Sequence, residues 1–130
     1  MKPVNSSDFP KPKGPFSYGV ISSGFVFVSG LASIDPATGE FQLGDIRHET
    51  ELTLLNIKRV LEAAGTGLDR IVKCSVYLKD INDFAALNEV YEKFFPNESQ
   101  RPARVTVQAV LGSNIKVEID AIAELPEQEF

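Results

Sequence analysis

The sequence predicts one α+β domain in which two helices cover one face of a single sheet. Three observations lead to this fold class. Two segments in the middle of the chain have amphipathic helical spacing, a strand pattern separates them, and further segments near both ends alternate or cluster apolar residues as strands do. The 130 residues fit one domain, and 43% of them are hydrophobic, which is enough to build a core.

The N-terminal part predicts a hairpin after a lead-in. Prolines and polar residues dominate residues 1–13, which are expected to be extended. A strand pattern begins at Phe16, a turn follows at Ser22–Gly24, and Phe25–Ser29 is an apolar strand expected to be buried on both faces. Turn residues fill Ile34–Glu40, and Glu40–Gln42 is a candidate short strand.

The first helix is predicted over Ile46–Ala64. Leu54, Ile57 and Leu61 repeat at the spacing of one helical face, and Gly65 suits the position after the last turn. His48 lies in the first turn among charged neighbours, so we expect it to be exposed.

A strand over Ile71–Lys79 and a helix over Asp83–Phe95 follow. Asp80 or Asn82 is expected to cap this helix, and Pro96 ends it. The apolar face of the strand is predicted to hold Val72, Cys74, Val76 and Leu78, and the buried stripe of the helix Phe84, Leu87, Tyr91 and Phe94.

Two late strands carry the most reactive pair of side chains. Val105 and its alternate neighbours predict a buried face, which places Arg104 on the polar face; the same alternation places Glu118 on the polar face of the last strand. If Gly112–Asn114 closes a tight hairpin, Glu118 lies opposite Thr106, with Arg104 diagonal to it at about 7–8 Å between Cβ atoms. The pair is then either a weak surface salt bridge or a site that binds a carboxylate and a water.

Composition excludes several functional classes. The net charge is −5 and no run of Lys or Arg offsets it, which disfavours nucleic-acid binding. Cys74 is the single cysteine, so an internal disulfide and a cysteine-rich metal site are excluded, and a cytoplasmic location is expected. No apolar run follows Met1, which argues against a signal peptide and a membrane span.

Gly30 is either a strand-end glycine or a position where backbone N–H faces a ligand.

Several stretches resemble the YjgF/RidA family of reactive-intermediate (enamine/imine) deaminases. They are Gly14–Phe16, Val28–Gly30, Asp35–Glu40, Leu55–Gly65, Val72–Phe84, Asn88–Phe95, Arg101–Arg104 and Lys116–Ala123, in order over about residues 12–124. The resemblance implies a chorismate-mutase-like single mixed sheet with two helices on one face, a homotrimer around a central barrel, and ligand sites in clefts between subunits. It also implies a strand between the last two, so that Arg104 and Glu118 share a sheet face without being direct neighbours.

The resemblance further implies hydrolysis of 2-aminoacrylate or 2-aminocrotonate to a 2-keto acid and ammonia, without cofactor or metal. Arg104 matches the residue that binds the substrate carboxylate, and Glu118 matches the acid that orients or deprotonates water. The remaining matched site positions are Phe16, Tyr18, Ser29, Gly30, Leu31, Asn88 and Thr106. Family members often have tyrosine at the position of Phe16, glutamine at Leu31 and cysteine at Thr106, which bears on substrate range.

Three other functions stay open. The same cleft could serve a non-catalytic trimeric module that binds 2-keto acids or amino acids. Phe16 and Leu31 would suit a deaminase for a larger, more apolar imine. An endoribonuclease or translation inhibitor is the remaining alternative, and the negative net charge weighs against it.

We predict that light scattering will give a single species with three times the mass of one chain. Sites between subunits require this assembly, because a monomer would hold only half of each cleft. A monomer with full activity would contradict the prediction.

Overall fold

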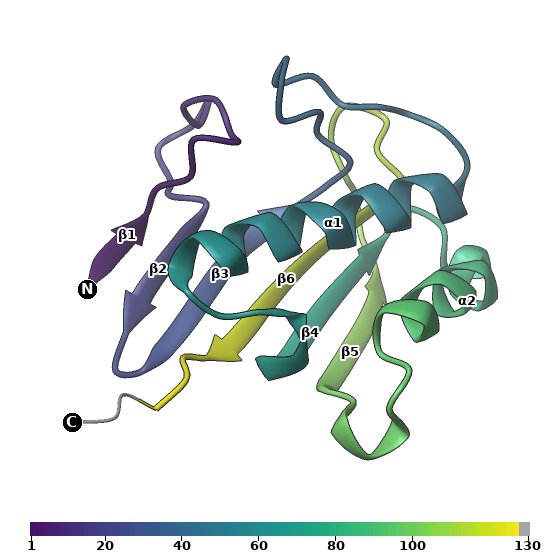
Figure 1. Cartoon of the computed structure of the whole chain (residues 1–130). Coiled ribbons are helices and arrows are strands. Elements are labelled where there is room, and N and C mark those ends of the chain that lie inside the picture. Colours follow the sequence, from purple (N-terminus) through teal and green to yellow (C-terminus); the bar gives the residue numbers. More distant parts are fainter. Residues whose placement is uncertain (128–130) are drawn as a thin grey trace.

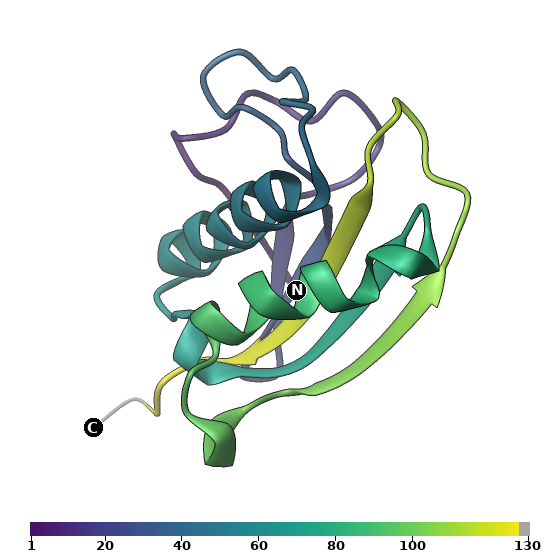
Figure 2. The same cartoon turned by 90° about the vertical axis from the view of Figure 1, so that its right-hand side faces the viewer.

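The computed structural model describes residues 1–127 and contains one six-stranded sheet with two α-helices on one face (Figure 1). Figure 2 shows both helices on the same side of the sheet. The elements are β1 (Lys2–Val4), β2 (Gly19–Ser22), β3 (Phe25–Leu31), α1 (Ile46–Ala64), β4 (Ile71–Leu78), α2 (Phe84–Phe94), β5 (Ala103–Gln108) and β6 (Val117–Glu124), with short 3-10 turns before β4, α2 and β5. The predicted fold class and the bounds of the first helix are confirmed.

The strand order is β1-β2-β3-β6-β4-β5. Among the six described strands, only β4 and β5 pair in parallel. Helix α2 forms the crossover between them, because a tight turn cannot join parallel strands. The last strand, β6, lies between β3 and β4 and is antiparallel to both. The tight hairpin between the last two strands is therefore wrong, and the separating strand that the family resemblance implied is β4.

The core lies between the sheet and the two helices. Leu54, Ile57 and Leu61 of α1 are fully buried, as predicted, and Gly65 ends the helix in the left-handed conformation at φ 90°. Asp80 caps the turn before α2 by accepting a hydrogen bond from the Asn82 amide. On α2 the buried set is Leu87, Val90 and Tyr91, followed by Phe95. Phe84 is instead 42% exposed and Phe94 only half-buried.

The N-terminal segments differ from the prediction in four places. Lys2–Val4 forms an edge strand on β2, and the strand expected from Phe16 begins at Gly19. Glu40–Gln42 contributes only one isolated bridge, between Phe41 and Ile34. β3 is not buried on both faces, since its valines face the helices while Phe25 and Phe27 are exposed on the other side.

β4 follows its predicted alternation only from Cys74 onward. Its pairing with β6 shifts register between Ile71 and Lys73, which buries Ile71 and leaves Val72 exposed. Cys74 is fully buried, as expected for a core residue, and burial raises the pKa of its thiol to about 11.

β5 presents the opposite face from the one predicted. Arg104 pairs with Cys74, and Thr106 with Val76, so both point to the side that the helices cover. Val105 and Val107 are 46% and 40% exposed on the other side, which we call the open face. Alternation fixes which residues share a face, but not which face the helices cover.

The helices of the model include none with the length and hydropathy to cross a membrane. Within residues 1–127, no group of three or more His, Cys, Asp or Glu residues is placed to hold a metal ion.

A buried carboxylate joins α1 to β6. Glu49 is fully buried and accepts hydrogen bonds from the backbone N–H of Gly44 and Lys116, and its Oε2 lies 3.2 Å from Lys116 Nζ. Two donors that would otherwise lack partners are thereby satisfied, and the segments before α1 and before β6 are tied together.

We expect Glu49→Ala to lower the free energy of unfolding by about 3 kcal/mol, because it leaves these donors without an acceptor. The exposed Glu51 on the same helix is the control, and Glu51→Ala should change the free energy of unfolding by less than about 0.5 kcal/mol. Urea unfolding at fixed protein concentration measures both, and equal effects would contradict the anchoring role.

Candidate functional site

Three loops gather at one end of the sheet (Figure 1). Their residues line an open pocket of about 590 Å³. The walls come from the segment before β2, the end of β3 with its following loop, and the segment leading into β6. We call it the Glu118 pocket. Five of the predicted site residues line it: Phe16, Tyr18, Gly30, Leu31 and Glu118.

Gly30 and Glu118 touch across neighbouring strands. A Cβ atom at Gly30 would lie 2.7 Å from Glu118 Oε2, a distance that real Cβ atoms essentially never show. The pairing of β3 with β6 is irregular between Val28 and Leu31, which brings the Gly30 backbone to the carboxylate. Gly30 is therefore more than a strand-end residue, because any side chain there would displace Glu118.

The Glu118 carboxyl is held in an environment that favours its neutral form. Burial raises its pKa above the usual 4.5, and the nearby negative charge of Asp120 raises it further. Within residues 1–127 the Glu118 carboxyl forms no hydrogen bond or ion pair with another residue. A carboxyl with a raised pKa and free oxygens can exchange a proton with a bound water.

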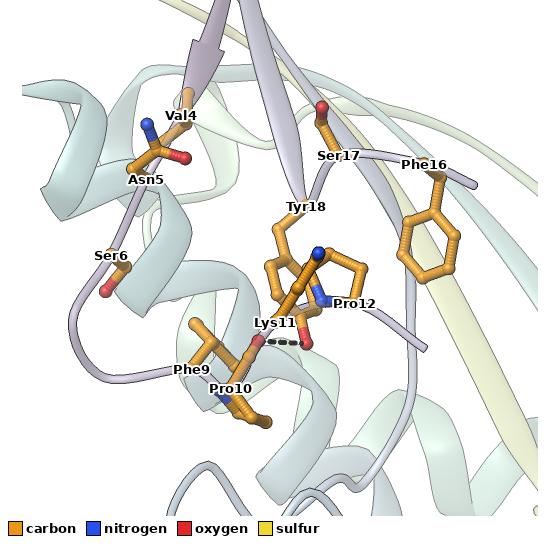
Figure 3. Close-up of a pocket in the computed structure, with 10 residues that line it drawn as sticks. All are labelled: Val4, Asn5, Ser6, Phe9, Pro10, Lys11, Pro12, Phe16, Ser17 and Tyr18. Atoms are coloured by element: carbon orange, nitrogen blue, oxygen red, sulfur yellow. Dashed lines mark hydrogen bonds between the residues drawn. The ribbon is translucent and has the colours of Figure 1, made fainter. Parts of the chain in front are cut away.

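Tyr18 forms part of the wall, but its hydroxyl is already engaged. The hydroxyl donates to the Pro10 carbonyl at 2.9 Å, and the ring lies 4.8 Å from Phe9 and 6.0 Å from Phe16 between centroids. Figure 3 shows this bond in a smaller pocket of about 360 Å³, whose lining also includes Phe16 and Tyr18. Tyr18 therefore holds the N-terminal segment in place and does not supply a hydroxyl at Phe16.

Ser29 supports the pocket without lining it. Its hydroxyl donates to the Ser17 carbonyl, and its amide donates to the Tyr18 carbonyl at 2.9 Å. These bonds fasten the end of β3 to the segment before β2, and so fix Gly30 beside Glu118.

Arg104 belongs to a second group, beneath α2. Its Cζ lies 4.7 Å from the centroid of the Tyr91 ring and 5.5 Å from that of Phe84. Within residues 1–127 its guanidinium forms no ion pair and no side-chain hydrogen bond. Thr106 shares the helix-covered face, and Asn88 lies on α2 one turn after Phe84. We call these residues the Arg104 group.

One chain does not bring Arg104 and Glu118 together. Glu118 pairs with Tyr77, whose partner on β5 is Val107, and all three belong to the open face. Arg104 lies on the helix-covered face, so the expected shared face is wrong. Strand β4 lies between the two residues and keeps them apart. The alternation along β5 turns the Arg104 side chain to the face opposite Glu118.

Sequence reasoning missed two features of these groups. The pairing of Arg104 with Phe84 and Tyr91 was not foreseen, although their spacing of seven residues puts both on one helical face. Asp120 was also missed: it accepts a hydrogen bond from the Tyr77 hydroxyl at 3.2 Å and adds to the shift at Glu118. The sequence did contain a signal for this: residues two apart on a strand share a face, so Asp120 had to lie on the same face as Glu118.

The fold and these two groups define a small α+β protein with a carboxyl-containing pocket. The chain belongs to the family described as Endoribonuclease L-PSP, whose model matches residues 6–125, and thus to the YjgF/RidA proteins. A RutC family protein of Pyrococcus horikoshii is 50% identical over 121 residues, covering 92% of this chain and 94% of that protein. A protein of Arabidopsis thaliana named chloroplastic Reactive Intermediate Deaminase A is 38% identical, covering 94% of this chain and 65% of the relative.

Solved structures match over nearly the whole chain. A putative endoribonuclease of Thermotoga maritima has a TM-score of 0.90 at 39% identity, covering 98% of this chain and 99% of that one. Escherichia coli TdcF, solved with bound serine, has a TM-score of 0.88 at 37% identity, covering 97% and 100%. The mixed sheet with two helices is therefore that of the YjgF-type structures.

We expect Glu118→Gln to stabilise the fold at pH 7 and not at about pH 4. The folded pKa of Glu118 lies above its unfolded value, so ionisation costs stability as pH rises from about 4.5, and glutamine removes that cost. Below the unfolded pKa the Glu118 carboxyl is neutral in both the folded and the unfolded protein, so the difference in stability between Glu118→Gln and the wild type should vanish.

Urea unfolding at the two pH values measures this difference. Glu124→Gln, at the exposed end of the same strand, is the control and should show little change. A variant that is less stable than the wild type at pH 7 would show that the Glu118 carboxylate is favourably bound instead.

Proposed function

We propose that the protein hydrolyses reactive enamine and imine intermediates, such as 2-aminoacrylate and 2-aminocrotonate, to 2-keto acids and ammonia without a cofactor. The observation that carries this proposal is the Arg104 guanidinium, half-buried against two aromatic rings with no anionic partner in residues 1–127. A carboxylate with two oxygens is the ligand that such a fork suits best. A cytoplasmic location belongs to the same proposal.

We further propose that each site forms between two copies of the chain in a homotrimer. The Arg104 group holds the anchor for a carboxylate, and the Glu118 pocket holds the proton-transfer group, but one chain keeps them apart. The open face also leaves Phe25, Phe27, Val105 and Val107 partly exposed, which is the apolar surface that an oligomer would cover.

The reaction needs few groups because an imine carbon is already electrophilic. An enamine first gains a proton on carbon and loses one from nitrogen, which gives the imine. Arg104 holds the carboxylate, and water adds to the imine carbon while Glu118 takes its proton. Glu118 then passes this proton to the nitrogen, which gives the tetrahedral amino alcohol. As the carbon–nitrogen bond breaks, Glu118 carries the hydroxyl proton to the nitrogen, so that ammonia leaves and the oxygen becomes the keto oxygen of the 2-keto acid.

The remaining predicted residues have supporting roles in this scheme. The backbone N–H groups of Gly30 and Thr106 are proposed to face the ligand, and Asn88 to support Arg104 from α2. Phe16 and Leu31 provide apolar walls of the Glu118 pocket. Such walls would exclude bulk water from the reacting carbon, which strengthens the interactions with Arg104 and Glu118.

A non-catalytic module for amino acids or 2-keto acids is the second candidate. The serine bound to the similar TdcF favours it, since that ligand carries the same carboxylate. Binding without turnover would distinguish this candidate from the deaminase.

We expect the wild type, in catalytic amounts, to speed keto-acid release when a serine or threonine dehydratase generates the imine and semicarbazide traps what survives. Arg104→Ala should lower this activity by about 100-fold or more, because two charge-assisted hydrogen bonds to the carboxylate are lost. Arg70→Ala, at an exposed arginine before β4, is the matched control and should retain activity.

Light scattering on both variants checks that the assembly is intact. Wild-type protein that leaves the rate unchanged, but whose melting temperature 2-ketobutyrate raises, would contradict the deaminase and support the binding module.

A further inference from the structure

Within residues 1–127 the Arg104 side chain is held without an anionic side chain beside it. An arginine loses about 2 kcal/mol of rotamer entropy when it is fixed, so a fixed guanidinium requires partners. In residues 1–127 the recorded partners are the rings of Phe84 and Tyr91, at 5.5 and 4.7 Å from Cζ. An acidic partner would have fixed the side chain equally well, but it would also compete with a substrate carboxylate for the same N–H groups.

α2 presents the two rings in different ways. Tyr91 is almost fully buried, with its ring 4.6 Å from that of Phe95, so it is fixed by the core. Phe84 opens the helix and is 42% exposed although it is aromatic. Core packing therefore does not account for the position of Phe84, whereas its place beside Arg104 does.

The ring of Tyr91, rather than its hydroxyl, makes this contact. The hydroxyl is buried and has no hydrogen-bond partner in residues 1–127. A guanidinium that lies over an aromatic face uses its own face for the contact, which leaves the in-plane N–H groups free to bind a carboxylate.

We propose that Phe84 and Tyr91 are positioning residues that hold the Arg104 guanidinium ready for the substrate carboxylate. This inference rests on the proposed function, because it assigns to Arg104 the binding of a 2-imino or 2-keto acid. The two rings act on carboxylate binding through Arg104 and take no part in proton transfer.

The test uses Phe84→Leu, Tyr91→Leu and Tyr91→Phe, with Phe94→Leu as the control at a half-buried ring of the same helix. Phe84→Leu and Tyr91→Leu should weaken the binding of 2-ketobutyrate, measured by calorimetry, roughly two- to thirty-fold, the range expected for a lost cation–π contact. In the dehydratase-coupled assay they should raise KM by a similar factor and change kcat little. Phe94→Leu should behave as the wild type, and Tyr91→Phe, which keeps the ring, should bind 2-ketobutyrate more tightly than Tyr91→Leu.

A spectroscopic readout separates positioning from general damage to the fold. The Nε–H resonance of Arg104, assigned by its loss in Arg104→Lys, should be shifted by the ring currents in the wild type. It should move toward the value of an exposed arginine in Phe84→Leu and stay in place in Phe94→Leu. Because Phe84 is partly exposed, this variant is expected to fold even if Tyr91→Leu does not.

The outcomes distinguish this inference from the proposed function. Suppose that the wild type binds 2-ketobutyrate but does not hydrolyse the imine, and that Phe84→Leu weakens binding. The proposed deaminase activity is then wrong, while the positioning role of the rings is supported. If wild type is active and Phe84→Leu binds like wild type with an unmoved Nε–H resonance, the positioning role fails and the deaminase stands. A wild type that neither binds 2-ketobutyrate nor turns over the imine would overturn both.

Discussion

The pairing of β4 with β5 on one side and with β6 on the other determines where the candidate site residues of these strands point. Arg104 follows the register of the buried Cys74, and Glu118 follows that of Tyr77 on the open face. Because side chains alternate along a strand, a slip of one residue in either pairing would reverse these directions. The separation of the two groups is thus a property of the sheet, not of flexible side chains.

Helix α1 supports the Glu118 pocket through two fully buried polar side chains. Asn56 donates to the carbonyls of Ala32 and Ile34, both in the pocket wall, and accepts a hydrogen bond from Arg59. Glu49 binds the backbone at Gly44 and at Lys116, next to another part of that wall. The loops around the pocket are therefore fixed by α1, which lets loop backbone form a defined site.

The two groups provide complementary chemistry by different physical means. Aromatic rings contact the Arg104 guanidinium, which has no ion-pair partner within residues 1–127, while burial and the charge of Asp120 raise the pKa of Glu118. One group is suited to hold a carboxylate and the other to move a proton. Because they lie on opposite faces of the sheet, the proposed reaction assigns the two groups of one site to two copies of the chain.

The sequence by itself determined the first helix and the family. The helical spacing of apolar residues predicted both ends of α1, its cap at Gly65 and the burial of Leu54, because these features depend on short-range periodicity. It also named Gly30 and Glu118, which the structure brings into contact. Only the tertiary structure decided which face of β5 the helices cover, the irregular pairing that exposes Val72, and the rings beside Arg104. Alternation is symmetric between the two faces of a strand, so these outcomes depend on long-range packing that no local pattern encodes.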